Sequence, residues 1–157
     1  MGCAVKKSLQ AIVLELGYKN TQKIIGINAL PTFIGRRTME FSFLNEENLE
    51  AAKALISGLG HAAEQVGDRV GMVTPRLVFM IINEAFYTLQ EGTAGEEDID
   101  TGMKLGTNYP MGPFEWCRKA GIENVYETLD ALWHDTRDER YKICPLLKTR
   151  YMQRVLA

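Results

Sequence analysis

The chain has 157 residues, of which 46% are apolar and 24% charged, and its 18 Lys and Arg against 20 Asp and Glu give a formal net charge of −2. This length suits one globular domain with a sizeable core, and it is short for an enzyme that carries a separate cofactor domain. A near-neutral chain without clusters of Lys and Arg is excluded as a nucleic-acid-binding protein, because contacts to phosphates need concentrated positive charge.

The cysteines are Cys3, Cys117 and Cys144, which are spaced too widely for a zinc-binding pair. We interpret them as reduced thiols, and this predicts a cytoplasmic protein without disulfides or bound metal. The apolar stretch near the N-terminus is interrupted at Glu15, and no small-residue cleavage site follows it. No apolar run reaches the roughly 18 residues of a membrane span, so neither a signal peptide nor a membrane anchor is predicted.

The first part of the chain alternates between helical and extended patterns. Apolar residues recur at helical spacing up to Gly17, a residue that can end a helix, although Ile12 and Val13 also suit a strand. Asn45 is a good N-cap for a later helix whose apolar stripe includes Leu55 and Leu59. In chain order we expect a helix over 5–16, strands over 23–29 and 38–44, a helix over 46–58 and a short strand over 61–66.

After Gly71 the pattern becomes helical throughout. Thr93 and Glu96 have the spacing of a capping box, and Pro113 and Pro145 suit first helical positions. The expected helices cover 75–91, 96–105, 113–120, 122–135 and a last segment from Pro145. The sequence therefore predicts a mainly α protein, with a small partial α/β segment over 1–68 followed by an all-helical domain over 69–157.

Two local patterns near the middle of the chain have a structural and a functional interpretation. The segment from Gly58 to Ala63 matches G-x-G-x-x-A, but it follows a predicted helix and leads to a strand, so we interpret it as a helix-terminating glycine pair. Glu40 lies on a predicted strand whose other face is apolar, and it is close in sequence to Asn28 and to the cationic Arg36 and Arg37. A carboxylate in that position either orients a catalytic base or lies on a solvated strand face, and the pattern alone leaves both open.

A long, ordered set of motifs in the second half resembles the C-terminal domain of the 3-hydroxyacyl-CoA dehydrogenase family. These motifs are GTAGEEDIDTGMKLG over 92–106 and YPMGPFE over 109–115, with NEA over 83–85 upstream and LLK over 146–148 downstream. The resemblance covers roughly 68–152. It implies a helical domain that forms a homodimer and helps to bind an acyl-CoA, with Met111, Pro113 and Phe114 as substrate-binding residues.

The upstream part is more weakly similar to the end of that family's NAD-binding domain. The family carries G-x-H-F-F-N-P and then a Glu, where the His is the catalytic base and the Glu holds it. If Glu40 is that Glu, Asn28 stands at the His position, because the offset of twelve positions between them suits the family spacing. The resemblance also places Ser8 in a segment that touches substrate, and the stretch DRVG over 68–71 at the junction between the domains.

The departures from the family pattern shape the functional prediction. Asn28 replaces the His, and an amide cannot accept a proton near neutral pH. Pro75 replaces the Asn whose amide binds the substrate carbonyl, and the glycine-rich turn that would hold NAD has no counterpart. We therefore expect a fragment or truncated member of the family that binds no NAD by itself and is inactive as an isolated chain. The alternative is a non-catalytic acyl-CoA-binding or dimerisation module.

A homodimer is also suggested by the amount of apolar surface on two of the helices. The helix over 75–91 and the C-terminal helix carry apolar residues that together exceed what one short chain can bury. These residues are Val78, Ile81, Ile82, Leu147, Tyr151 and Val155.

Overall fold

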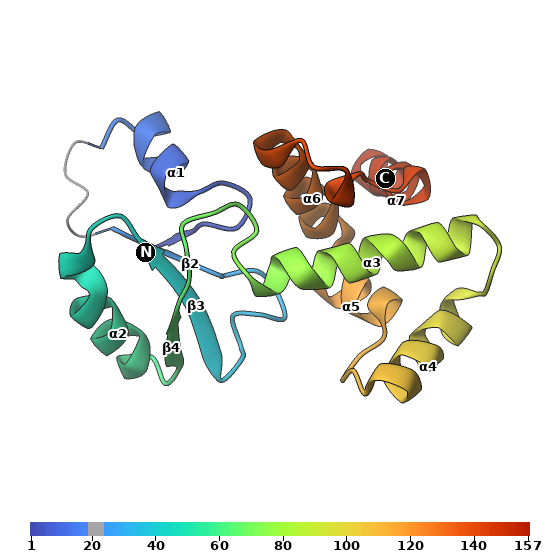
Figure 1. Cartoon of the computed structure of the whole chain (residues 1–157), viewed down its shortest axis with the longest axis horizontal. Helices are drawn as coiled ribbons and strands as arrows, with labels where there is room; N and C mark the ends of the chain where they lie inside the picture. Colours follow the sequence, from blue (N-terminus) through green and yellow to red (C-terminus); the bar gives the residue numbers. More distant parts are fainter. Residues whose placement is uncertain (19–23) are drawn as a thin grey trace. The chain divides into compact units, whose positions relative to one another are not determined.

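The computed structural model describes residues 1–18 and 24–157. They form two compact units, Met1–Pro75 and Arg76–Ala157. This division falls in the first turn of a long helix, whereas the sequence patterns place the boundary between residues 68 and 69. The fold is mainly α, with a small sheet near the N-terminus followed by helices, as predicted (Figure 1).

The first unit contains a four-stranded sheet in the order β1-β2-β3-β4. Its strands are β1 (Gly2–Cys3), β2 (Ile25–Ile27), β3 (Thr38–Phe43) and β4 (Ala62–Gln65). β2 and β3 are antiparallel, while the outer pairs β1/β2 and β3/β4 are parallel. The strands predicted over 38–44 and 61–66 are confirmed. The strand predicted over 23–29 is confirmed over Ile25–Ile27, and its first residue lies outside the described ranges.

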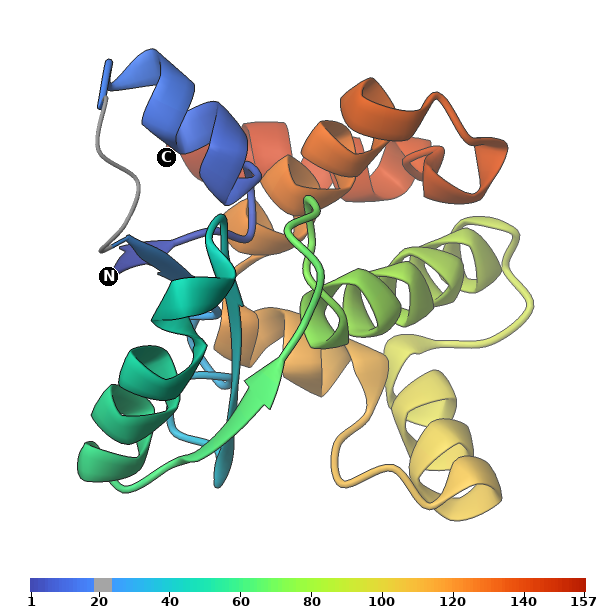
Figure 2. The same ribbon diagram turned by 60° about the vertical axis from the view of Figure 1, so that its left-hand side comes forward.

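The two faces of this sheet have different characters. On one face Ile25, Ile27, Met39 and Phe41 pack against α2 (Leu49–Gly58). Gly26 alternates with these isoleucines, so it faces the other way, where a Cβ would lie 2.6 Å from Ala4 Cβ and 3.6 Å from Leu9 Cβ. Leu9 opens α1 (Leu9–Glu15), so α1 and α2 cover opposite faces (Figure 2). Only a glycine fits at this strand position.

Both helices of the first unit begin later than the sequence suggests. Ser8 has an extended backbone, with φ −65° and ψ 152°, and is the N-cap of α1, so the predicted start at residue 5 is wrong. Asn45 is confirmed as an N-cap, but of a 3₁₀ turn over Glu46–Asn48 that precedes α2. Of the apolar stripe predicted for this helix, Ala52 and Ile56 are 3% and 0% exposed, whereas Leu55 and Leu59 are 47% and 54% exposed and do not belong to the core.

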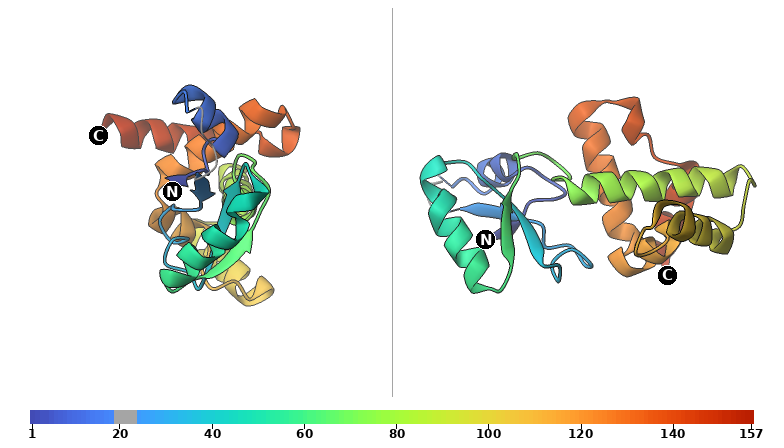
Figure 3. Two further views of the ribbon diagram at one scale, coloured as in Figure 1. Left: turned by 90° about the vertical axis from the view of Figure 1, so that its left-hand side faces the viewer. Right: turned by 60° about the horizontal axis from the view of Figure 1, so that its bottom comes forward.

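The five helices predicted for the second part of the chain are confirmed. Each predicted helix end lies within two residues of the observed end, and for the last helix only the start was predicted. The helices are α3 (Thr74–Gln90), α4 (Glu96–Thr107), α5 (Pro113–Ala120), α6 (Ile122–Thr136) and α7 (Pro145–Leu156). α3 is the longest, with 17 residues (Figure 3). The predicted capping box is wrong: Gly95 is the N-cap of α4, and Glu96 instead accepts a hydrogen bond from Arg150 Nη1 at 2.6 Å.

Two buried polar side chains join the helices of the second unit. Asn83 of α3 donates from Nδ2 to the Lys142 carbonyl at 2.9 Å and accepts at Oδ1 from the Cys144 N–H at 2.9 Å. Asp100 of α4 accepts from the Phe114 N–H at 2.7 Å and the Glu115 N–H at 3.0 Å. Each side chain satisfies backbone groups next to the start of another helix, where intrahelical partners are missing.

Across the described ranges, no helix combines the length and the apolar character needed to cross a bilayer.

Candidate functional site

Asn28 and Glu40 are neighbours across the antiparallel ladder of β2 and β3. The pairing of Ile27 with Phe41 continues as a bond from the Asn28 N–H to the Glu40 carbonyl, at 3.1 Å. Directly opposed side chains leave the sheet on the same face, and Asn28 Nδ2 donates to Glu40 Oε2 at 3.3 Å. The register therefore brings the two predicted residues together.

Glu40 is also bound to the residue that begins α3. The Thr74 N–H donates to Glu40 Oε1 at 2.7 Å, and the Thr74 hydroxyl donates to the same oxygen. Glu40 is only 8% exposed and Asn28 only 4%. The alternative in which Glu40 lies on a solvated strand face is therefore wrong, and both oxygens of this carboxylate are held by named donors.

A cavity of about 410 Å³ opens beside this pair and is lined by Asn28, Glu40, Thr74 and Arg36 among others. The Arg36 guanidinium lies 5.1 Å from the centre of the Phe33 ring. The chemistry available to Asn28 is limited by its amide, which can donate and accept hydrogen bonds but cannot take up a proton near neutral pH. The pair is thus suited to hold and polarise a ligand and lacks a proton acceptor at the Asn28 position.

Two other predicted substrate residues of the first unit have clear structural roles. Ser8 Oγ accepts from the Ala11 N–H at 3.2 Å and so caps α1. Pro75 is buried in the first turn of α3, where a missing N–H costs nothing. The hydroxyl of Ser8 is engaged by its own helix, and Pro75 has no side-chain donor to offer.

Asp68 is a residue of this region whose role the sequence patterns missed. Its carboxylate accepts from the Leu9 N–H at 2.6 Å and from the Gln10 N–H at 2.9 Å, and Ser42 Oγ lies 3.4 Å away. Asp68 therefore completes the capping of α1 from almost sixty residues away in the chain. No local spacing rule could have found this contact, because the partners meet only in the folded unit.

Two segments of the first unit can be compared with the phosphate-binding turn of a dinucleotide site, the glycine pair after α2 and the connection from β1 to α1. Gly58 ends α2, Gly60 has φ +87° and β4 begins at Ala62, so the interpretation of this segment as a helix terminator is confirmed. The connection from β1 to α1 does run from a strand to a helix. The N–H groups of Leu9 and Gln10 at the start of α1, however, already donate to the Asp68 carboxylate. The negative charge of this carboxylate would repel a phosphate.

The predicted substrate residues of the second unit do not share one cavity. Pro113 borders an apolar cavity of about 470 Å³ that is also lined by Leu77 and Met80. Phe114 borders a different cavity, of about 420 Å³. Met111 is half-buried, and its sulfur accepts a hydrogen bond from Lys119 Nζ at 3.3 Å.

The three thiols differ in exposure, and this leads to a prediction. Cys3 is exposed, whereas Cys117 and Cys144 are buried, and burial raises the pKa of the Cys117 thiol to about 12. Because the thiolate is the reactive form, a disulfide reagent at about pH 8 should titrate one thiol quickly in the native protein and the other two only after denaturation. Cys3→Ser should abolish the fast phase; a fast phase that persists in this variant would contradict the assignment.

The family model of the 3-hydroxyacyl-CoA dehydrogenase C-terminal domain matches residues 71–156, more than half of the chain. The chain belongs to the 3-hydroxyacyl-CoA dehydrogenase family. The match covers all five helices from α3 to α7.

Individual relatives agree with this assignment. The chain is 46% identical over 91 residues to 3-hydroxyadipyl-CoA dehydrogenase of Escherichia coli (strain K12), which is 58% of this chain and 19% of that protein. It is 34% identical over 130 residues to the probable 3-hydroxybutyryl-CoA dehydrogenase of Bacillus subtilis (strain 168), covering 81% of this chain and 45% of the relative.

A solved structure extends the likeness to both units. The (S)-3-hydroxybutyryl-CoA dehydrogenase of Ralstonia eutropha has a TM-score of 0.82 and 26% identity, and the match covers 94% of this chain and 52% of that one. The chain therefore spans only about half, or less, of the length of these relatives.

Proposed function

We propose that this chain is a fragment or truncated member of the 3-hydroxyacyl-CoA dehydrogenase family, whose enzymes oxidise 3-hydroxyacyl-CoA with NAD in fatty-acid metabolism, and that it is inactive as an isolated chain. Family membership and the names of its relatives support the substrate class. The observation that carries the proposal is the buried pair in which Asn28 donates to Glu40. Glu40 holds and orients Asn28, and Asn28 can position a substrate oxygen without removing its proton.

An assay of the isolated chain tests this proposal. With 3-hydroxybutyryl-CoA and NAD we expect no NADH formation, because the Asn28 position lacks the general base, a group typically worth about 10²–10⁴-fold in rate. A fluorescence titration with NADH should show no saturable binding. Turnover that depends on Glu40, and that Glu40→Gln removes, would overturn the proposal, as would tight NADH binding.

The alternative is a non-catalytic acyl-CoA-binding or dimerisation module. Measurements of acetoacetyl-CoA binding and of self-association on the same chain distinguish between these functions. If acetoacetyl-CoA binds with an affinity that Glu40→Gln weakens, the pair contributes to a ligand site. If acetoacetyl-CoA does not bind while the chain self-associates, the dimerisation module is favoured.

A homodimer through the second unit remains part of the proposal, with a corrected set of residues. Val78, Ile82 and Leu147 are 6%, 0% and 0% exposed in the chain, so the idea that one chain cannot bury these three residues is wrong. The apolar surface that stays open includes Leu77, which is 57% exposed, and Val155, which is 60% exposed. These two residues lie on the same two helices that the sequence patterns indicate.

Light scattering tests the dimer. At tens of micromolar protein we expect the mass of two chains, because a second copy would cover the apolar residues of α3 and α7. Leu77→Lys should shift the mass toward one chain, while the exposed Leu105→Lys on α4 serves as the matched control. A monomeric mass for the unmodified chain would contradict the dimer.

We also propose a cytoplasmic location, which the three free cysteines support.

A further inference from the structure

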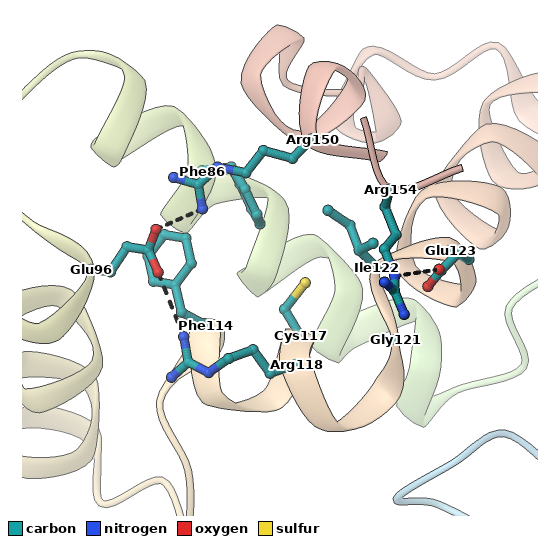
Figure 4. A pocket seen from close by; sticks show the side chains of 10 residues that line it. All are labelled: Phe86, Glu96, Phe114, Cys117, Arg118, Gly121, Ile122, Glu123, Arg150 and Arg154. Atoms are coloured by element: carbon teal, nitrogen blue, oxygen red, sulfur yellow. Dashed lines mark hydrogen bonds and ion pairs between the residues drawn. The ribbon is translucent and has the colours of Figure 1, made fainter. Parts of the chain in front are cut away.

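The second unit contains a cavity of about 420 Å³ for which the proposed function gives no role (Figure 4). Side chains from five helices, α3 to α7, line it. Apart from Phe114, none of its lining residues belongs to a site predicted from the sequence. Its volume lies within the range of about 300–1,000 Å³ that is usual for small-molecule sites.

The inner surface of this cavity consists of two aromatic rings and a thiol, and the Arg150 guanidinium lies 5.4 Å from the centre of the Phe86 ring. The rings of Phe86 and Phe114 are each 2% exposed and meet edge to face, with 5.0 Å between their centroids. The Cys117 thiol lies beside them, and burial raises its pKa to about 12, so it stays protonated. Such a surface favours an aliphatic group over a polar one.

The rim carries charged side chains that are engaged to different degrees. Arg150 is tightly paired with Glu96, at 2.6 Å. Arg118 reaches Glu96 only at 3.5 Å and Asp100 at 3.4 Å, and Arg154 reaches Glu123 only at 3.4 Å. Charge-assisted hydrogen bonds are normally about 2.7–2.9 Å, so these two guanidiniums are held loosely.

Arg118 and Arg154 are also placed to meet a ligand from two sides. Arg118 is on α5 and Arg154 on α7, and Figure 4 shows them on either side of Cys117. Their side chains are 64% and 69% exposed, so they can turn toward a ligand without disturbing the core. The lining holds three arginines against two glutamates, and Asp100, which does not line the cavity, pairs with Arg118 at 3.4 Å.

We propose that this cavity binds an aliphatic carboxylate, with its hydrocarbon chain against Phe86 and Phe114 and its carboxylate between Arg118 and Arg154. The forked donors of arginine match the two oxygens of a carboxylate, and the apolar inner surface accepts the chain. Inorganic phosphate would meet the arginines but leave the apolar surface unused.

Calorimetric titration of the full chain with octanoate tests the proposal. We expect saturable binding with a Kd of about 0.1–1 mM, on the scale of small ligands. Octanamide, which has the same chain without the charge, and inorganic phosphate should each bind about tenfold more weakly or worse, because each keeps only one half of the recognition.

Arginine variants then locate the site. Arg118→Gln and Arg154→Gln should each weaken octanoate binding by about tenfold, since each loses one charged donor. Arg140→Gln is the matched control, because Arg140 is an exposed arginine of the same unit that pairs with Asp138 and does not line the cavity. It should leave the affinity unchanged, and circular dichroism should show all three variants folded.

Several results would overturn the proposal. Equal affinity for octanoate and octanamide would mean that the arginines have no role, and equal affinity for phosphate would mean that the apolar surface has none. No binding of octanoate at about 10 mM, or an Arg140→Gln variant weakened as much as the other two, would reject the site itself.

Discussion

Gly112→Ala is expected to destabilise the second unit by about 3 kcal/mol. A Cβ at this position would overlap with the Cβ, Cγ and Oδ1 of Asp100. The overlap involves atoms next to the α4 backbone, so a simple side-chain rotation cannot relieve it. Moving Asp100 would also break its bonds to the N–H groups of Phe114 and Glu115 at the start of α5.

Urea unfolding followed by tryptophan fluorescence measures this effect, because both tryptophans, Trp116 and Trp133, lie in the second unit. Gly102→Ala is the matched control: it lies inside α4, and a Cβ there meets nothing within 4 Å. Since alanine favours helix over glycine, Gly102→Ala should raise stability by about 0.5–1 kcal/mol. Equal midpoints for the two variants would show that Gly112 is not constrained by Asp100.

Asn83→Ala is expected to cost about 3 kcal/mol as well. The side chain is 1% exposed and serves two backbone groups that follow α6, the Lys142 carbonyl and the Cys144 N–H. Its removal leaves both groups without their partner, and Cys144 is fully buried. An unsatisfied buried group loses its hydration without replacement.

The same unfolding experiment applies, with Asn124→Ala as the comparison. Asn124 Nδ2 donates to the Ala120 carbonyl, four residues away, from a half-buried position. Water can replace that bond, so we expect a loss of no more than about 1 kcal/mol. A loss for Asn83→Ala that does not exceed the loss for Asn124→Ala would refute the idea that Asn83 joins separate segments.

The helices of the second unit could be predicted well because their signals are local. Pro113 at the start of α5 and Gly121 after its end act through the backbone of one segment. The start of α1 could not be predicted in this way. Its apolar spacing continues back to Val5, but Asp68 binds the N–H groups of Leu9 and Gln10 and fixes the first turn there.

In the candidate site, too, one feature could be predicted from the sequence and another depends on contacts between distant segments. The resemblance paired Asn28 with Glu40 through a spacing of twelve residues, and the antiparallel register of β2 and β3 supplies the geometric reason. The role of Thr74 as a second donor to Glu40 left no trace in the sequence, because 34 residues separate the two.

The sequence by itself determined the family and the mainly α character, since each depends on residue identity or on local periodicity, and the resemblance predicts that Asn28 stands where the family has its histidine. Only the tertiary structure decided that Glu40 is buried and fully engaged, and that Val78, Ile82 and Leu147 belong to the interior of the unit. The tertiary structure also revealed a cavity between Arg118 and Arg154, which lie on different helices. Burial and long-range hydrogen bonds depend on which segments contact each other in the folded chain, and these tertiary contacts cannot be read residue by residue from a single sequence.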